Sequence, residues 1–139
     1  MSDIIEQASE VRNGFADFLD EARTRPKYFK RRKLQYVLMT VDEFDRLACT
    51  DIDVKAVKDD NGSFYTKSKA LPEVIGFGST EQEALRSFEE GAVSFAYEYY
   101  DNYPLYSASP GRAEQAAIIT KIVAHNERVG SITDLLKAS

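Results

Sequence analysis

Hydrophobic positions in the first quarter of the chain recur at helical spacing. One face of residues 9–23 is apolar, through Val11, Phe15, Phe18, Leu19 and Ala22. This spacing predicts an amphipathic helix that ends before Pro26, because proline cannot continue a helix. Gly14 lies inside the helix at a cost of roughly 1 kcal/mol relative to alanine. Ile4, Ile5 and Ala8 either form a short strand or extend the helix.

The next segment changes to the alternation that is typical of strands. Residues 27–31 and 34–41 are rich in aromatic and β-branched side chains, and Arg32 and Lys33 separate them. We therefore predict a β-hairpin with its turn at these two residues. Thr40 is placed to cap a helix over residues 42–49, with Glu43 as its capping-box partner.

The second half begins with three short alternating segments. Residues 51–57 and 63–68 flank the turn-rich sequence DDNG, and residues 74–77 form a third candidate strand. A long helix follows, capped by Ser79 or Thr80. Its apolar stripe consists of Ala84, Leu85, Phe88, Ala92, Phe95 and Tyr99. These elements predict a three-stranded antiparallel sheet covered by one helix. Residues 105–108 are the only candidate for a fourth strand.

Two further helices are predicted at the C-terminal end. Residues 113–126 carry one apolar side, formed by Ala116, Ile119, Ile122 and Val123. Ser131 caps a last short helix with Ile132, Leu135 and Leu136. Helices this short are not stable alone, so they must contact the body of the protein, a second copy or a partner. The sequence YEYYDNYPLY at residues 97–106 holds five tyrosines. They form a partner-binding surface or complete the core, and both interpretations remain open.

Composition narrows the class of protein. The chain has 139 residues, 43% of them hydrophobic, a net charge of −5 and one cysteine, Cys49. A disulfide framework and a thiolate metal cage are therefore excluded. No basic leader with an apolar core and no long apolar run occurs, so we expect a cytoplasmic protein without a membrane segment.

Charge is distributed unevenly along the chain. Residues 1–41 have a net charge of +2, residues 42–101 of −8 and residues 102–139 of +1. Residues 23–33 hold seven basic residues and no acid. Such a run is either a solvated face or a nucleic-acid contact. The asymmetry favours a head that faces nucleic acid and a body with another task.

No pattern of catalytic residues emerges. The single histidine, His125, has neither a second histidine nor a serine motif to act with, and we expect it at the surface. Cys49 is interpreted as a small buried residue. We assign Asp59-Asp60 to a turn and Glu89-Glu90 to a solvated helix face. The sequence therefore predicts a protein that is not an enzyme and that has no cofactor and no metal site.

The first half resembles the Phd/YefM family of antitoxins. The resemblance covers about residues 3–48 and rests on SEVRNGFADFLDEAR followed by FKRRKLQYVLMTVDEFDRL. It departs from the family pattern at Val11, Gly14, Arg32 and Leu34. Members of this family form dimers through this half and use it to bind operator DNA, and the resemblance implies the same here.

The second half resembles HicB-type antitoxins. The matching points are Gly62, Tyr65, Leu71-Pro72, Gly78, Thr80 and Glu83-Ala84. The expected fold class is α+β. Residues 1–50 form a helix–β-hairpin–helix domain for dimerisation and DNA binding. Residues 51–108 form a HicB-like domain, and residues 109–139 a helical segment for toxin binding or oligomerisation.

These resemblances imply the antitoxin of a type II toxin–antitoxin system, which blocks a cognate toxin and represses its own operon. Arginines at a hairpin tip suit phosphate clamping or bidentate contacts to guanine. The candidate DNA-binding residues are Ser9, Arg12, Asn13, Lys30, Arg31, Arg32 and Lys33. The candidate toxin-binding residues are Tyr99, Tyr103, Ile119, Ile122, Leu135 and Leu136. We expect the helices from Ala113 onward to order on toxin binding.

The partners implied are the toxin, operator DNA and a second copy of the chain, with a higher oligomer left open. Two alternatives stand beside this hypothesis. One is a standalone transcriptional regulator whose C-terminal domain senses a ligand or protein. The other is an interaction scaffold whose basic hairpin serves solubility only.

Overall fold

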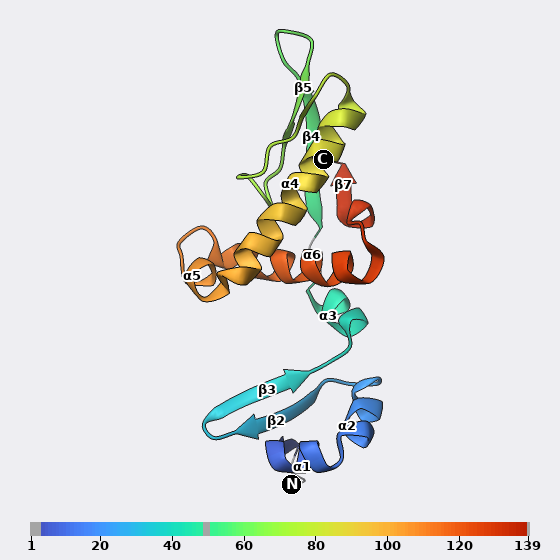
Figure 1. Cartoon of the computed structure of the whole chain (residues 1–139), viewed down its shortest axis with the longest axis vertical. Helices are drawn as coiled ribbons and strands as arrows, with labels where there is room; N and C mark the ends of the chain where they lie inside the picture. The colour runs from blue at the N-terminus through green and yellow to red at the C-terminus, as the bar shows by residue number, and fades with distance from the viewer. Residues whose placement is uncertain (1–3, 49–50, 139) are drawn as a thin grey trace. The chain divides into compact units, whose positions relative to one another are not determined.

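The chain forms two compact units, each described by itself. A computed structural model describes residues 4–48 and 51–138. The units are Met1–Leu47 and Ala48–Ser139 (Figure 1). Both combine helices with a small sheet, which confirms the predicted α+β class. Cys49 lies outside the described residues.

A three-stranded sheet organises the first unit. Its strands are β1 (Ile5–Gln7), β2 (Lys27–Arg31) and β3 (Leu34–Leu38), in the order β1-β2-β3. The predicted hairpin and its two-residue turn are confirmed, because Arg31 pairs with Leu34. The third strand ends at Leu38 and not at Val41. The open choice at the N-terminus is resolved in favour of a strand, which pairs in parallel with β2.

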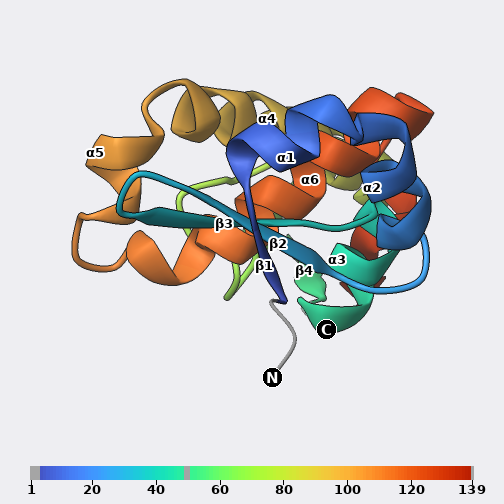
Figure 2. The same cartoon turned by 90° about the horizontal axis from the view of Figure 1, so that it is seen from below.

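The predicted first helix is divided in two. Helix α1 (Ala8–Asn13) ends at Gly14, and α2 (Phe15–Ala22) begins directly after it. Gly14 has φ −123° and ψ 42°, which lies outside helical geometry. The prediction of one continuous helix was therefore wrong. Figure 2 shows α1 leading out of β1 on one side of the sheet.

Aromatic contacts and one lysine hold α2 against the sheet. The ring of Phe18 meets the edge of Phe29 at 5.9 Å between centroids, and Phe29 stacks on Tyr36 at 5.1 Å. The Lys27 ammonium lies 2.9 Å from Glu21 and 3.4 Å from Glu6. It also lies 5.5 Å from the centroid of Phe18. Lys27 thus joins β1, α2 and β2.

Helix α3 (Val41–Leu47) starts with the predicted cap. Thr40 Oγ1 accepts a hydrogen bond from the Glu43 N–H at 3.1 Å. Both Glu43 carboxylate oxygens accept from Arg46, at 2.7 and 2.8 Å. The Glu43 side chain therefore forms an ion pair within the helix, while the Thr40 hydroxyl accepts a hydrogen bond from a backbone N–H group of the first turn.

A four-stranded sheet forms the base of the second unit. It contains β4 (Ile52–Lys58), β5 (Phe64–Lys67), β6 (Phe77–Gly78) and β7 (Leu136–Ala138), in the order β6-β5-β4-β7. Strands β4 and β5 confirm two of the three predicted strands, whereas β6 shares only Phe77 with the third, predicted at residues 74–77. The fourth strand was misplaced, because residues 105–108 fall largely in α5 (Tyr103–Ser107). The last predicted helix is a 3₁₀ turn, η2 (Thr133–Leu135), followed by β7, which pairs in parallel with β4.

Helix α4 (Glu81–Asp101) covers one face of this sheet (Figure 1). Thr80 caps it by accepting from the Glu83 N–H at 3.1 Å, and Glu83 in return accepts from the Ser79 N–H at 2.8 Å. A β-carbon on Gly76 would lie only 2.2 Å from the Ala84 carbonyl oxygen. Glycine at this position therefore permits the close approach of the β6 segment to the helix.

The core of the second unit includes the C-terminal helix. A 3₁₀ turn, η1 (Ala113–Gln115), leads into α6 (Ala116–Val129), which packs on α4. Ile118, Ile119 and Ile122 of α6 are buried in the same cluster as Phe88 and Tyr99 of α4. Helix α6 therefore shares one core with α4.

His125 also lies on α6 and is 9% exposed, so the prediction of a surface histidine was wrong. Its ring nitrogens have no hydrogen-bond partner among the described residues.

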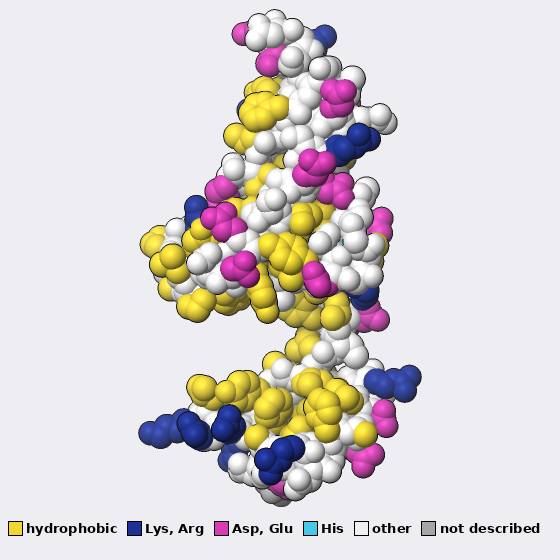
Figure 3. Space-filling view, viewed as in Figure 1, with side chains coloured by type: hydrophobic (Ala, Val, Ile, Leu, Met, Phe, Trp, Pro, Cys, Tyr) yellow, Lys and Arg dark blue, Asp and Glu magenta, His cyan; other side chains and the backbone are white. Residues whose placement is uncertain are grey.

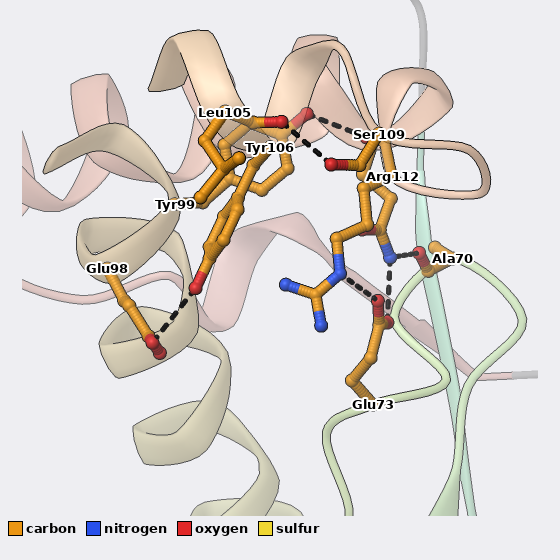
Figure 4. A network of polar contacts seen from close by, with 9 residues as sticks. Ala70, Glu73, Glu98, Tyr99, Leu105, Tyr106, Ser109 and Arg112 are labelled. Carbon is orange, nitrogen blue, oxygen red and sulfur yellow. Dashed lines mark hydrogen bonds and ion pairs between the residues drawn. The ribbon is translucent and has the colours of Figure 1, made fainter. Parts of the chain in front are cut away.

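A polar network fixes the connection between α4 and α6 (Figure 4). The Tyr99 hydroxyl donates to the Arg112 carbonyl at 2.6 Å, and the Arg112 guanidinium lies 4.7 Å from the Tyr106 ring centroid. The Gln115 amide donates to the Ala70 carbonyl at 3.2 Å and to Glu73 at 2.8 Å. Burial raises the pKa of the Tyr99 hydroxyl. The tyrosine-rich segment thus contributes mainly to the core at Tyr99, Tyr103 and Tyr106.

Glu89 has a structural partner that the sequence did not reveal. One of its carboxylate oxygens accepts from the Ser131 hydroxyl at 2.9 Å and from the Ile132 N–H at 3.2 Å. The Thr133 hydroxyl adds a bond at 3.0 Å. The expectation of a solvated face was therefore wrong for Glu89, which anchors the turn before β7. Asp59 is confirmed as a turn residue, because it accepts from the N–H groups of Asn61 and Ser63.

The Lys27 contacts lead to a test of stability. We expect Lys27→Ala to lower the melting temperature near neutral pH, because it leaves Glu21 without its partner. The hydrogen bond from Lys27 is the main cause that lowers the pKa of Glu21. The contribution is therefore present above the ordinary glutamate range and is lost as pH falls through the lowered pKa. The gap between wild type and variant should shrink below about pH 4.3.

Thermal melts followed by circular dichroism at several pH values measure this effect. Lys30→Ala is the matched control, since Lys30 is exposed on the same strand. Equal losses from both variants would contradict a structural role for Lys27.

Candidate nucleic-acid interface

Most of the predicted DNA-binding residues lie around one surface depression in the first unit. It is lined by Gln7, Ala8, Ser9, Arg12, Lys30, Arg31 and Arg32. These residues come from the end of β1, from α1 and from the hairpin tip. The structure therefore brings five of the seven predicted side chains together from segments about twenty positions apart.

Parallel pairing of β1 with β2 produces this arrangement. Gln7, the last residue of β1, is the register partner of Lys30, the penultimate residue of β2. The chain enters α1 directly after Gln7, so the first turns of α1 begin beside the hairpin tip. This position of α1 places Ser9 and Arg12 next to Arg31 and Arg32.

The cations at this depression are exposed and unneutralised. Arg12, Lys30, Arg31 and Arg32 form no ion pair with another residue in the ranges 4–48 and 51–138. Lys27 and Arg46 of the same unit are both paired with carboxylates. Figure 3 shows Lys and Arg side chains gathered at the hairpin end of this unit. Free cations so close together create a positive potential that favours an anion.

Arg32 has an unfavourable backbone conformation. Its φ of 57° is in the left-handed region, and it is the only residue other than glycine among the described residues with a positive φ. For most residues this conformation costs roughly 1 kcal/mol or more, whereas glycine adopts it freely. Strain of this kind at an exposed tip is a signal of function.

The other two predicted residues lie at the margin. Asn13 and Lys33 are exposed but do not line the depression. The N-terminus of α1 contributes little to the depression. Helix α1 has only six residues, and the Glu10 carboxylate accepts the Gln7 N–H at 3.1 Å. The anion preference of the depression therefore depends on its side chains.

Sequence reasoning missed how little apolar surface the first unit buries. Its buried hydrophobic residues are Val11, Phe18 and Ala22. Its exposed large hydrophobic residues, from 39% to 63% exposed, are Ile4, Phe15, Leu19, Leu34, Tyr36, Val37, Val41 and Leu47. Figure 3 shows part of this apolar surface beside the cationic end. Monomeric proteins rarely expose so much contiguous apolar surface without a binding role.

The predicted toxin-binding residues fall into two groups. Tyr99, Ile119 and Ile122 are fully buried, so they offer no surface to a partner while this fold is intact. Tyr103, Leu135 and Leu136 are half-buried against the same core. Helix α6, where we expected ordering on toxin binding, packs in the core in this structure. Exposed apolar side chains of this unit lie elsewhere, and among them are Tyr100 and Leu105.

Metal and membrane chemistry have little support in the described part of the chain. No group of three or more His, Cys, Asp or Glu side chains is arranged there to hold a metal ion. None of its helices is both long and apolar enough to cross a membrane.

Comparison with known proteins agrees with the sequence resemblance at a coarser level. A family model described as antitoxin of toxin–antitoxin, RelE/RelB, TA system matches residues 3–136. Among curated proteins, no sequence matches this chain.

One similar solved structure is an antitoxin part of a proposed toxin/antitoxin system from Syntrophomonas wolfei subsp. wolfei. It is 20% identical, with a TM-score of 0.81 over 100% of this chain and 99% of that chain. That likeness establishes the shared fold, and the family model spans nearly the whole sequence. The chain therefore belongs to the PHD-like family of antitoxins of toxin–antitoxin systems.

Proposed function

We propose that this antitoxin represses its own operon by binding operator DNA through the first unit and neutralises a cognate toxin through the second. The first unit acts as a dimer of the Phd/YefM type. The observation that carries the proposal is the cationic depression at the hairpin tip. There Arg12 of α1 lies with Arg31 and Arg32, and none of the three has an ion-pair partner among the described residues.

Phosphate contact is the role that fits these side chains best. Arginine presents a planar fork of donors that matches phosphate oxygens and the guanine edge. Ser9 adds a hydroxyl donor at the same depression. A projecting two-stranded ribbon is also narrow enough to enter the major groove. Arg31 and Arg32 are therefore assigned to the groove, and Lys30 and Arg12 to the flanking phosphates.

The exposed apolar residues of the first unit support dimerisation. A unit of fewer than fifty residues whose buried apolar side chains, among the described residues, are Val11, Phe18 and Ala22 has little stability of its own. A second copy that covers residues such as Val37 and Leu34 supplies the missing burial, at roughly 25 cal/mol per Å² of apolar surface. Two copies also double the phosphate contacts and match the two-fold symmetry of a palindromic operator.

The toxin-binding role is assigned to the end of α4 and to α5. Tyr100 is 57% exposed and Leu105 is 65% exposed. The acids Glu98 and Asp101 lie in the same segment. Hydrophobic side chains gather over α5 in Figure 3. Exposed aromatic and aliphatic anchors with flanking acids suit a small basic toxin.

Operator binding is tested by the double variant Arg12→Ala/Arg31→Ala. We expect weaker binding with an unchanged melting temperature, because both side chains are exposed and unpaired within the described ranges. If a dimer neutralises about six to eight phosphates, log K against log salt has a slope of roughly −5 to −7. Arg12 is the phosphate contact of the pair, so the loss of two phosphate contacts per dimer should make the slope less steep by about 1.8. Fluorescence anisotropy with the upstream DNA measures both quantities.

Arg23→Ala/Arg25→Ala is the matched control for operator binding. It removes the same charge from exposed arginines that lie outside the depression. Both variants should remain dimers by light scattering. An equal loss of affinity in the control would mean that exposed arginines of this unit act only through general electrostatics. Unchanged affinity in the test variant would contradict the assignment of Arg12 and Arg31 to DNA contact.

The strained turn gives a second prediction, in which stability and binding move in opposite directions. Arg32→Gly relieves the positive φ, so we expect a gain in stability of roughly 0.5–1 kcal/mol. The same change removes a cation from the depression and should weaken operator binding. Chemical denaturation and anisotropy on one preparation test both effects. A variant that binds as well as the wild type would show that Arg32 has no DNA contact.

Toxin neutralisation is tested by co-expression with the product of the adjacent gene. We expect Leu105→Glu to abolish protection, because it places a charge at the centre of the proposed apolar contact. Val129→Glu is the matched control, since Val129 is a similarly exposed apolar residue of the same unit, at 55%. Co-purification of the two proteins provides a second readout. Equal protection from the toxin by both variants would mean that the toxin binds another surface. If the neighbouring gene product is not toxic, only the role of a transcriptional regulator remains.

A further inference from the structure

We propose that the open face of the four-stranded sheet in the second unit binds single-stranded nucleic acid. This sheet has two distinct faces. Ile52, Val54 and Thr66 are buried on the face that α4 covers. Strand alternation places Lys55, Tyr65, Lys67, Phe77 and Lys137 on the opposite face. We call this second face the open sheet face.

Two aromatic residues occupy neighbouring positions on the open sheet face. Tyr65 of β5 is the register partner of Phe77 of β6. Phe77 is 68% exposed, which is the highest value among the exposed large hydrophobic residues of the described chain. Ile75, two positions earlier, is 51% exposed. Aromatic side chains displayed on a flat sheet are platforms on which unpaired bases stack.

Lysines flank these rings, and two of them face each other directly. Lys55 of β4 is the register partner of Lys67 of β5, and the Lys67 ammonium lies 5.9 Å from the centroid of Tyr65. Like charges in directly opposed positions destabilise a sheet. An anion bound between them removes this penalty. The arrangement therefore favours a ligand that carries negative charge.

The positive charge of the open sheet face contrasts with the rest of the second unit. Residues 51–138 hold nine basic and fourteen acidic side chains, a net charge of −5. Four of the six lysines in this range are at or beside the open sheet face, namely Lys55, Lys67, Lys69 and Lys137. None of the four forms an ion pair with a described carboxylate.

The carboxylate of Asp53, which lines the groove on this surface, already has partners. Asp53 accepts hydrogen bonds from the backbone N–H groups of Lys69 and Ala70, both at 2.8 Å. Burial opposes ionisation of Asp53, but these bonds outweigh it and lower its pKa. Asp53 therefore stays charged and is held toward the loop that follows β5. It organises a groove lined by Lys55, Tyr65, Lys67, Lys69 and Ile75.

The combination distinguishes a single strand from other anions. Lysine is depleted in protein–protein interfaces, so a row of four argues against a protein as the main occupant. A duplex keeps its bases stacked and offers nothing to Tyr65 and Phe77. A single strand supplies phosphates for the lysines and base faces for the rings, which matches both halves of the surface. This activity is separate from operator binding by the first unit.

The test uses the full chain with its first unit silenced by Arg12→Ala/Arg31→Ala. The probe is a fluorescein-labelled RNA of twelve nucleotides with mixed sequence, and anisotropy reports binding. We expect Phe77→Leu to weaken binding about tenfold, because leucine keeps the apolar character but loses the stacking. Phe77→Trp should retain it. Lys55→Ala/Lys67→Ala should make the slope of log K against log salt less steep by about 1.4.

Lys58→Ala is the matched control, since Lys58 is an exposed lysine of β4 with the opposite strand parity. It should leave binding unchanged, and none of these surface variants should lower the melting temperature. The proposal is overturned if the silenced chain does not bind the RNA at low salt. It is equally overturned if Phe77→Leu and Phe77→Trp bind the RNA with the same affinity. Capture of a polyglutamate peptide in place of RNA, with the same lysine dependence, would make the surface a protein-docking site.

Discussion

Parallel pairing of a three-residue strand with the hairpin determines the architecture of the first unit. Because Gln7 pairs with Lys30, the start of α1 is fixed at the hairpin tip, and the return of the chain through α2 brings Glu21 to Lys27. One alignment thus places Arg12 beside Arg31 and Arg32 at one end of β2 and builds an ion pair at the other. A shift of one residue in β1 would turn its side chains to the opposite face and separate these groups.

The basic segment from Arg23 to Lys33 is consequently divided by function. Lys27 is largely buried among carboxylates and an aromatic ring, with 17% of its side chain exposed, and serves the fold. Lys30, Arg31 and Arg32 extend beyond the helices and have no acid to pair with among the described residues. A count of charges along the sequence does not distinguish Lys27 from these three residues. The neighbours contributed by β1 and α2 decide which cation is structural and which is available to a ligand.

Local patterns in the sequence were sufficient for elements whose stability is local. The hairpin, the Thr40 and Thr80 caps and the stripe of α4 all follow from side chains within a few positions of one another. The misses depend on distant partners. Strand β7 exists because β4 lies more than eighty residues earlier and offers an edge, and Glu89 is anchored by Ser131 and Thr133. The break at Gly14 is an exception, because it falls at a residue whose own helix propensity is low.

The candidate sites show the same division. The exposed clustering of the candidate DNA-binding residues was predictable, because a cationic tip has no stable place inside a small fold. The burial of several candidate toxin-binding residues was not, since an apolar stripe such as Ile119 and Ile122 looks identical whether it covers a core or a partner. Exposure separates the two cases: Leu105, which the sequence assigned to a strand, is exposed, whereas Tyr99 is buried.

Marginal burial in the first unit connects its proposed partners with its stability. A fold that leaves Leu34, Val37 and Leu47 exposed gains stability from whatever covers them, by mass action. If a second copy is that cover, folding of the first unit depends on the concentration of the chain, and DNA binding draws on the same equilibrium because only the folded dimer presents two tips. Repression then depends on antitoxin concentration more steeply than it would with a single binding step. The second unit differs, because its core from Ile52 to Ile132 is buried within the unit itself.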